Sequence, residues 1–163
     1  MNDTEKEKAF VEMIEANQHL IYKVCYMYSH DKENIDDLYQ DVVLNLWKSY
    51  SNFRNESKRS TWIYRVTLNT CITYYRRFLR QPKVVPITLD IVNNQDDDSY
   101  VQGLIGELYN MIDLLNETEK AIILLYLDKN SYREIADIMG LSVSNVGIRL
   151  LRIKDKLKTS KIK

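Results

Sequence analysis

The sequence is poor in residues that interrupt helices, with four glycines and two prolines among its 163 residues. These two residue types dominate tight turns and end helices, so their scarcity argues against a sheet-rich chain. No apolar run reaches the roughly 18 residues of a membrane helix. The first residues, MNDTEKEKAF, lack the basic start and apolar core of a signal peptide. The sequence therefore predicts an all-α protein that stays in the cytoplasm.

Cysteine and histidine are also scarce, with two of each. Cys25 and Cys71 lie far apart, and neither they nor the histidines have the spacing of metal ligands. In a reducing compartment, buried thiols are favoured over a disulfide or a redox switch. The chain also shows no nucleophile–base pair and no phosphate-binding glycine loop. We therefore expect neither an enzyme nor a bound metal or cofactor.

The net charge is zero, but the charges alternate in blocks along the chain. Residues 1–50 carry a net charge of −5, 51–83 carry +7, 84–119 carry −8 and 120–163 carry +6. Solvated helix faces of uneven composition would explain one such block. Two basic blocks, each coinciding with a motif, instead indicate two surfaces that face nucleic acid.

The acidic stretch around Pro82 and Pro86 divides the chain into two helical parts. It has no apolar periodicity, and its prolines interrupt helices. We therefore expect a first domain at 1–80, an acidic linker at 81–99 and a second domain at 100–163. The first domain should begin with one long helix, or two short ones, between residues 5 and 28.

Two predicted helices and a polar loop make the first domain distinctive. Apolar spacing predicts one helix from about Asn34, as its N-cap, to residue 49, with an acidic outer face. After the loop, Ser60 should cap a second helix at 61–78, which carries arginines and interleaved aromatics. Aromatic rings stack on unpaired bases, although core packing is the commoner use of any single ring. The pattern alone favours a solvated polar face for the acidic side, which would also suit a helical protein partner. The loop with the basic helix suits single-stranded nucleic acid.

The second domain should begin with helices at 100–115 and 117–127. Asn116 and Glu119 resemble a capping box at the start of the second of these helices. The run AIILLYL places that helix at the centre of the second core.

Residues 131–152 show the pattern of a helix-turn-helix. Ser131 and Ser142 are the expected N-caps, and Gly140 allows the tight turn between the two helices. The stripe that should pack the last helix comprises Val143, Val146, Leu150, Ile153 and Leu157. The second helix of such a motif enters the major groove, where Arg and Asn read base edges. A plain helical hairpin is the alternative.

Four stretches together resemble a known family: DDLYQDVVLNLW, FRNES followed by TWIYRV and Asn69, YYRR, and SYREIADIMGLSVSNVGIRLLRIKDKL. They are similar to bacterial sigma factors of the sigma-70 superfamily, in the small extracytoplasmic-function (ECF) group. In that family the first three make region 2 and the last makes region 4. The resemblance implies a promoter-specificity subunit that binds core RNA polymerase, recognises the −35 and −10 elements and promotes DNA melting.

The resemblance also implies roles for three sets of residues. The set that would bind polymerase comprises Asp37, Leu38, Gln40, Asp41, Leu44 and Trp47. The set that would hold the melted −10 element and its flipped base comprises Phe53, Arg54, Asn55, Lys58, Arg59, Trp62, Arg65, Asn69, Arg76 and Arg77. The set that would read the −35 element comprises Ser142, Ser144, Asn145, Gly147, Ile148, Arg149 and Arg152. The implied partners are core RNA polymerase and promoter DNA, and the family also admits an anti-sigma factor.

The chain departs from the family at both DNA-facing sets. Lys58 and Arg59 stand where many members have a small residue and an aromatic, and Gly147 and Ile148 replace a lysine and a small polar residue. The alternative function is a stand-alone helix-turn-helix regulator with a helical sensing or dimerisation domain. The paired acidic and basic helices upstream argue against that alternative.

Overall fold

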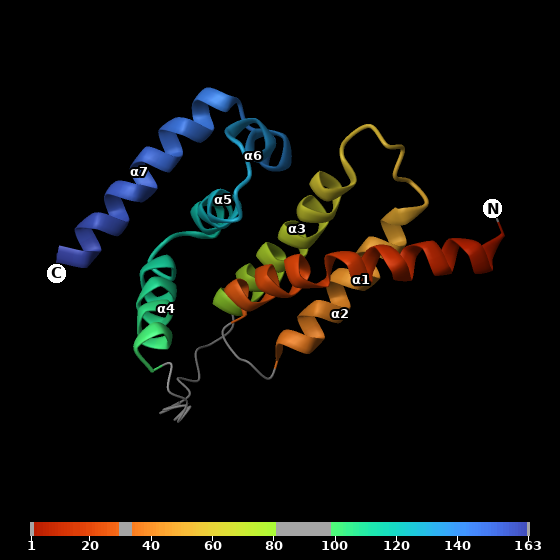
Figure 1. Cartoon of the computed structure of the whole chain (residues 1–163), viewed down its shortest axis with the longest axis horizontal. Helices are drawn as coiled ribbons and strands as arrows, with labels where there is room; N and C mark the ends of the chain where they lie inside the picture. Colours follow the sequence, from red (N-terminus) through yellow and green to blue (C-terminus); the bar gives the residue numbers. More distant parts are fainter. Residues whose placement is uncertain (1, 30–33, 81–98, 163) are drawn as a thin grey trace.

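The computed structural model describes residues 2–29, 34–80 and 99–162. Every regular element within these ranges is a helix (Figure 1), which confirms the all-α prediction. The predicted acidic linker lies almost entirely outside the described residues.

Three helices make the first bundle: α1 (Asp3–Tyr28), α2 (Ile35–Tyr50) and α3 (Arg59–Arg80). Each packs against the other two. The first is one continuous helix, opened by a capping box between Asn2 and Glu5. Within it, the Asn17 side-chain amide donates to the Met13 carbonyl one turn earlier, at 2.8 Å. Of the two alternatives for residues 5–28, the structure therefore has the single long helix.

Two predicted caps in the first bundle are wrong. Asn34 adopts a helical conformation (φ −96°, ψ 0°) and makes no capping hydrogen bond, whereas an N-cap needs extended backbone. Ser60 lies inside α3, which begins at Arg59; the Trp62 amide already donates to the Lys58 carbonyl at 3.2 Å. The helix therefore takes up part of the predicted loop.

Four helices make the second bundle: α4 (Ser99–Ile112), α5 (Glu117–Leu127), α6 (Tyr132–Met139) and α7 (Val143–Ile162). The capping box at α5 is confirmed: the Glu119 amide donates to Asn116 Oδ1 at 2.8 Å, and the Asn116 amide donates to Glu119 Oε1 at 3.1 Å. The helix α4 ends three residues earlier than predicted, and a turn carries Leu115 into the core.

The helix-turn-helix has the predicted local geometry. Ser131 accepts from the Glu134 amide, Ser142 accepts from the Asn145 amide, and each of these bonds is 3.1 Å long. Gly140 has φ +69°, a left-handed conformation that glycine adopts without steric cost. Of the predicted stripe, Val146, Leu150 and Ile153 are buried and Leu157 is partly buried, but Val143 is 48% exposed. Val143 opens the helix, where its side chain lies beyond the reach of the core.

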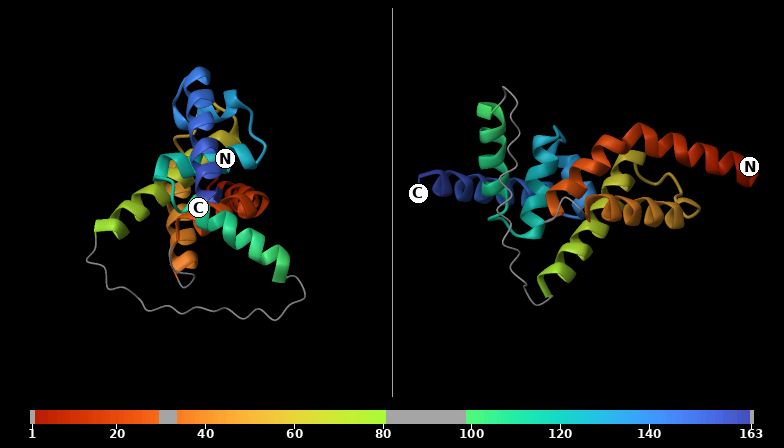
Figure 2. Two further views of the ribbon diagram at one scale, coloured as in Figure 1. Left: turned by 90° about the vertical axis from the view of Figure 1, so that its left-hand side faces the viewer. Right: turned by 90° about the horizontal axis from the view of Figure 1, so that it is seen from below.

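The two bundles lie against each other through α3, which contacts α5 and α6. The start of α1 and the end of α7 lie at opposite ends of the molecule (Figure 1; Figure 2, right). Cys25 and Cys71 are buried in the first core with their sulfurs 3.9 Å apart, as free thiols. The contact between the bundles places part of the basic helix α3 against the second bundle.

Candidate nucleic-acid and polymerase interfaces

The outer face of α2 is acidic and open to solvent. Asp37, Gln40, Asp41 and Leu44 are exposed along it, with Leu44 at 49%. Asp36 and Asp37 lie in the first helical turn, where the helix dipole favours negative charge. This face offers carboxylates around one apolar side chain, as a protein-binding helix does.

Two members of the predicted polymerase-binding set do not lie on this face. Leu38 is 1% exposed and belongs to the core. Its position on the inner stripe of α2 turns it toward α1 and α3. Trp47 is partly buried, with its ring edge-on to Phe10 at 4.9 Å and the Lys6 ammonium 5.2 Å from its ring centre. Both residues pack on the core side of α2.

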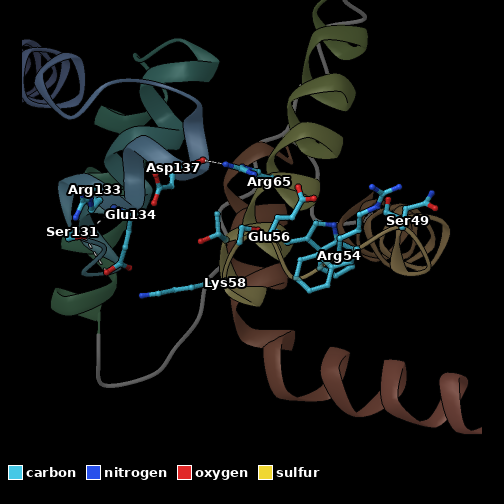
Figure 3. Close-up of a pocket in the computed structure, with 14 residues that line it drawn as sticks. Ser49, Arg54, Glu56, Lys58, Arg65, Ser131, Arg133, Glu134 and Asp137 are labelled. Carbon is cyan, nitrogen blue, oxygen red and sulfur yellow. Dashed lines mark hydrogen bonds between the residues drawn. The ribbon is translucent and has the colours of Figure 1, made fainter. Parts of the chain in front are cut away.

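A cleft of about 880 Å³ lies between the loop after α2, the start of α3 and helix α6 (Figure 3). The members of the −10 set that line it are Phe53, Arg54, Lys58, Trp62 and Arg65. The rings of Phe53 and Trp62 stack with their centres 4.8 Å apart. Asn55, at the loop tip, has φ +58°, which asparagine tolerates better than most residues. The cleft thus combines an aromatic stack with four cationic residues and three carboxylate residues, which are Arg54, Lys58, Arg65 and Arg133, and Glu56, Glu134 and Asp137.

The remaining members of the −10 set lie elsewhere. Asn69 and Arg77 line a second hollow, between α2 and α3, together with Asp41 and Leu44 of the polymerase-binding set. Arg59 is exposed at the first residue of α3. Arg76 pairs with Glu117 of the second bundle, with Nε and Oε1 3.0 Å apart. The structure therefore places the members of the −10 set, which the family resemblance groups together, at several separate sites.

The far wall of the cleft was missed by the sequence analysis. It is formed by α6, through Arg133, Glu134 and Asp137 with the cap Ser131. Arg65 donates from Nε to the Asp137 carbonyl at 3.0 Å, and Nη2 donates to the same oxygen (Figure 3). Arg65 and Asp137 are 72 residues apart in sequence, and no local pattern relates them.

Two ionisable groups at the contact between the bundles have perturbed pKa values. The pKa of the Glu117 carboxyl is lowered by a backbone hydrogen bond at the start of α5 and by the hydrogen bond from Arg76. Burial and the hydrogen bond to the Asp128 carboxylate raise the pKa of the Tyr64 hydroxyl. Glu117 therefore favours its charged form there and Tyr64 its neutral form.

The outer side of α7 carries the predicted −35 set. Ser142, Ser144, Ile148 and Arg152 are exposed, with Ile148 at 52%. Arg149 and Asn145 are partly buried and hydrogen-bonded to each other, with Nε and Oδ1 3.0 Å apart. A Cβ added at Gly147 would lie 3.7 Å from the Tyr132 ring, so this glycine sits close to α6. The predicted −35 set thus presents hydroxyls, the apolar side chain of Ile148 and a bonded Arg–Asn pair.

None of the helices that the structure describes is both long and apolar enough to cross a membrane. Within the same residues, no three His, Cys, Asp or Glu side chains converge as metal ligands would.

Comparison with known proteins identifies both bundles. Residues 13–80 match the family model of sigma-70 region 2, and residues 105–157 match that of sigma-70 region 4. The chain is 26% identical over 164 residues to the ECF RNA polymerase sigma-E factor of Haemophilus influenzae, covering 93% of this chain and 86% of that protein. It is 28% identical over 130 residues to RNA polymerase sigma factor SigZ of Bacillus subtilis, covering 79% and 73%.

Two solved structures share the fold. CnrH in complex with the cytosolic domain of CnrY matches with a TM-score of 0.70 at 19% identity, over 94% of this chain and 87% of that chain. The sigma factor RpoE in complex with the anti-sigma factor NepR, from Bartonella quintana, matches with a TM-score of 0.67 at 18% identity, over 93% and 96%. Because its two bundles are sigma-70 regions 2 and 4 in that order, the chain belongs to the sigma-70 family of RNA polymerase sigma factors, in the ECF group.

Proposed function

We propose that this ECF sigma factor binds core polymerase through the outer face of α2, holds the melted −10 strand at the cleft beside α3, and reads the −35 element with α7. As a sigma factor it directs RNA polymerase to promoters and is not an enzyme. The observation that carries the residue assignments is the cleft of Figure 3, where stacked rings and cations share one hollow.

The polymerase contact is assigned to the exposed part of the predicted set. Asp37, Gln40, Asp41 and Leu44 form a continuous strip along α2. Complementary charge steers association and rejects wrong partners, while one central apolar side chain supplies buried area. The strip therefore suits a basic, partly apolar helical surface on polymerase.

The −10 contact is assigned to the cleft. Flipping a base out of the duplex costs a few kcal/mol of unstacking, and stacking on an aromatic ring returns about 1–3 kcal/mol per base. The Phe53–Trp62 stack offers that platform, and Arg54, Lys58 and Arg65 can neutralise the neighbouring phosphates.

The −35 contact is assigned to α7. Arg149 and Asn145 hold each other in place, so less side-chain freedom is lost when they meet base edges. Ile148 replaces a polar residue of the family and can contact a thymine methyl group. Ser142 and Ser144 can donate to phosphates at the helix N-terminus.

We also propose that the protein acts in the cytoplasm and that an anti-sigma factor binds it. Support for a cytoplasmic site comes from the family, because transcription takes place there. Support for an anti-sigma partner comes from the RpoE structure, whose partner is the anti-sigma factor NepR.

Run-off transcription with bacterial core polymerase on a library of promoter fragments tests the proposal. We expect start sites that appear only when this protein is present, and Arg149→Ala should weaken selection at the −35 element more than at the −10 element. If no start site depends on the protein while it binds a duplex site tightly alone, the stand-alone regulator is correct.

A further inference from the structure

Five aromatic side chains form a continuous cluster that runs from α1 to the cleft. The ring of Phe10 in α1 lies edge-on to Trp47, with the ring centres 4.9 Å apart, and edge-on to Tyr50 at 5.3 Å. The Tyr50 ring, at the end of α2, lies 6.3 Å from Trp62, whose ring stacks on Phe53 at 4.8 Å. We call these five side chains the ring cluster. The stacked pair that lines the cleft is therefore the outer end of a longer packed array.

Polar contacts join the same end of α1 to the loop after α2. The Lys6 ammonium donates to the Ser51 hydroxyl and lies 5.2 Å from the centre of the Trp47 ring. The Phe53 amide donates to the Tyr50 carbonyl at 3.4 Å, so the loop leaves α2 in a tight turn. The loop that carries Phe53 is thus held by α1 as well as by α2.

The two α1 residues that make these contacts belong to none of the three predicted sets. Phe10 and Lys6 precede residue 13, where the match to sigma-70 region 2 begins. Among residues 2–12, all of which the structure describes, Phe10 is the single buried side chain, at 6% exposure. Its ring contacts direct that burial toward the end of α2. The first turns of α1 are therefore fastened to the part of region 2 that leads into the cleft.

Packing of this kind lowers the cost of stacking a base. A ring that rotates freely loses conformational freedom when a base stacks on it, whereas a ring already fixed by its neighbours loses little. Aromatic rings pack in preferred edge-on and stacked arrangements, so fixing one ring constrains the next. Phe53 and Trp62 are partly buried, so both keep some surface open while neighbouring side chains restrict them. The ring cluster therefore orders the platform before DNA arrives.

We propose that Phe10 and Lys6 are positioning residues: through the ring cluster and the loop after α2, they hold Phe53 and Trp62 in the orientation that receives a flipped base. The first turns of α1 thereby contribute to −10 recognition without touching DNA. This inference rests on the proposed −10 function of the cleft.

Phe10→Ala tests the inference through a base that can be removed from the DNA. The probe is a labelled promoter fragment from the run-off library, with its −10 element held unpaired by mismatches and bound by the holoenzyme. Single abasic nucleotides, placed in turn along the non-template strand, locate the base whose loss weakens wild-type binding most. Fluorescence anisotropy then gives the affinity for the intact probe and for that abasic probe.

The intact probe should bind the Phe10→Ala holoenzyme about fivefold more weakly than the wild type, because the platform must then be ordered during binding. With the abasic probe, the two holoenzymes should bind within about 1.5-fold of each other, since no base remains to stack. The ratio of the intact to the abasic affinity should therefore fall about fivefold. Binding to core polymerase should stay within about twofold of the wild type.

Ile21→Ala is the matched control for lost core packing. Ile21 is 0% exposed and lies in the same helix, about three turns beyond Phe10. Its truncation also removes buried apolar contacts, but it leaves the ring cluster complete, so the affinity ratio should equal that of the wild type. A wild-type ratio in Phe10→Ala, or an equal fall in both variants, would mean that Phe10 acts on stability alone and would overturn the inference.

A surface variant covers the case in which Phe10→Ala fails to fold. Lys6→Ala removes the bond to Ser51 and the cation beside Trp47, and it should lower the affinity ratio about twofold to threefold. Lys6→Arg keeps a cationic donor and should restore most of the ratio. Lys8→Ala removes the same charge at an exposed position of α1 and should keep the wild-type ratio. Equal ratios in Lys6→Ala and Lys8→Ala would contradict the positioning role.

Failure of the proposed function has a separate signature. If no abasic position weakens binding of the wild type, the cleft does not hold a flipped base and the proposed −10 function fails. If one position does so but Phe10→Ala keeps the wild-type ratio, only the positioning role fails.

Discussion

On α2, solvent exposure differs among the side chains that were predicted together as one polymerase-binding set. Leu38 and Asp41 are three residues apart, yet Leu38 is in the core and Asp41 faces outward. Helical spacing predicts which residues share a stripe, but the partner-binding set drawn from family resemblance mixes both stripes. Burial is what distinguishes a contact residue from one that supports it.

Asp41→Arg should weaken binding to core polymerase by about tenfold or more, because a reversed charge at an interface is repelled by its former partner. The measurement is a fluorescence titration of labelled protein with core enzyme. Glu15→Arg, the same change at an exposed position of α1, is the control and should bind like the wild type. A loss of similar size in both variants would show that overall charge, and not the strip on α2, sets the affinity.

The two glycines of the helix-turn-helix should respond in opposite directions to alanine. Gly140→Ala should lower the free energy of unfolding by about 1 kcal/mol, because φ is +69° there. Gly147→Ala should raise it by about 0.5–1 kcal/mol, since it lies within α7 and its added methyl group meets the Tyr132 ring at an ordinary 3.7 Å. Thermal unfolding followed by circular dichroism measures both, and shifts of the same sign would contradict this account.

At the scale of elements, helix N-termini were predictable where the side chain of the N-cap residue accepts a hydrogen bond from an amide in the first turn. Asn116, Ser131 and Ser142 each make the expected bond to an amide three residues on. Asn34 and Ser60 carry suitable side chains, but the backbone at both is already helical. The residue type permits a cap, and the preceding chain decides whether the backbone is extended enough to use it.

Asn116→Ala should lower the free energy of unfolding by about 1 kcal/mol, since it removes one half of the capping box at α5. Urea denaturation monitored by circular dichroism gives the value. Asn110→Ala, in the interior of α4 and exposed, should change it by less than about 0.5 kcal/mol. If Asn116→Ala were equally neutral, the cap would not stabilise the second core.

In the whole molecule, the sequence predicted two helical domains and their motifs but not how they meet. The contacts that join them link residues 41 to 105 positions apart. The basic character of α3 was visible in the sequence, but the engagement of Arg65 and Arg76 by region 4 was not. Such pairings depend on the shapes of two folded surfaces, which no periodicity encodes.

The Arg76–Glu117 pair should make stability depend on pH. Because the pKa of Glu117 is lowered from its ordinary 4.5 in the folded protein, its contribution is complete above that value and is lost as the pH falls through the lowered one. At about pH 7 the wild type should melt at a higher temperature than Glu117→Gln, and the two should coincide once the pH is well below the lowered pKa. Thermal unfolding at intermediate pH values traces the change. A gap of constant size at all pH values would contradict it.

The burial of Lys120 has a kinetic consequence. Its amine is sealed between Tyr75 and Asp113 from opposite domains, whereas the other lysines whose side chains the structure describes reach solvent at least in part. An acylating reagent therefore modifies those lysines at once, but modifies Lys120 only in molecules whose domains have momentarily parted. The rate at which Lys120 is acylated, followed by mass spectrometry over time, therefore reports how often the two domains separate spontaneously.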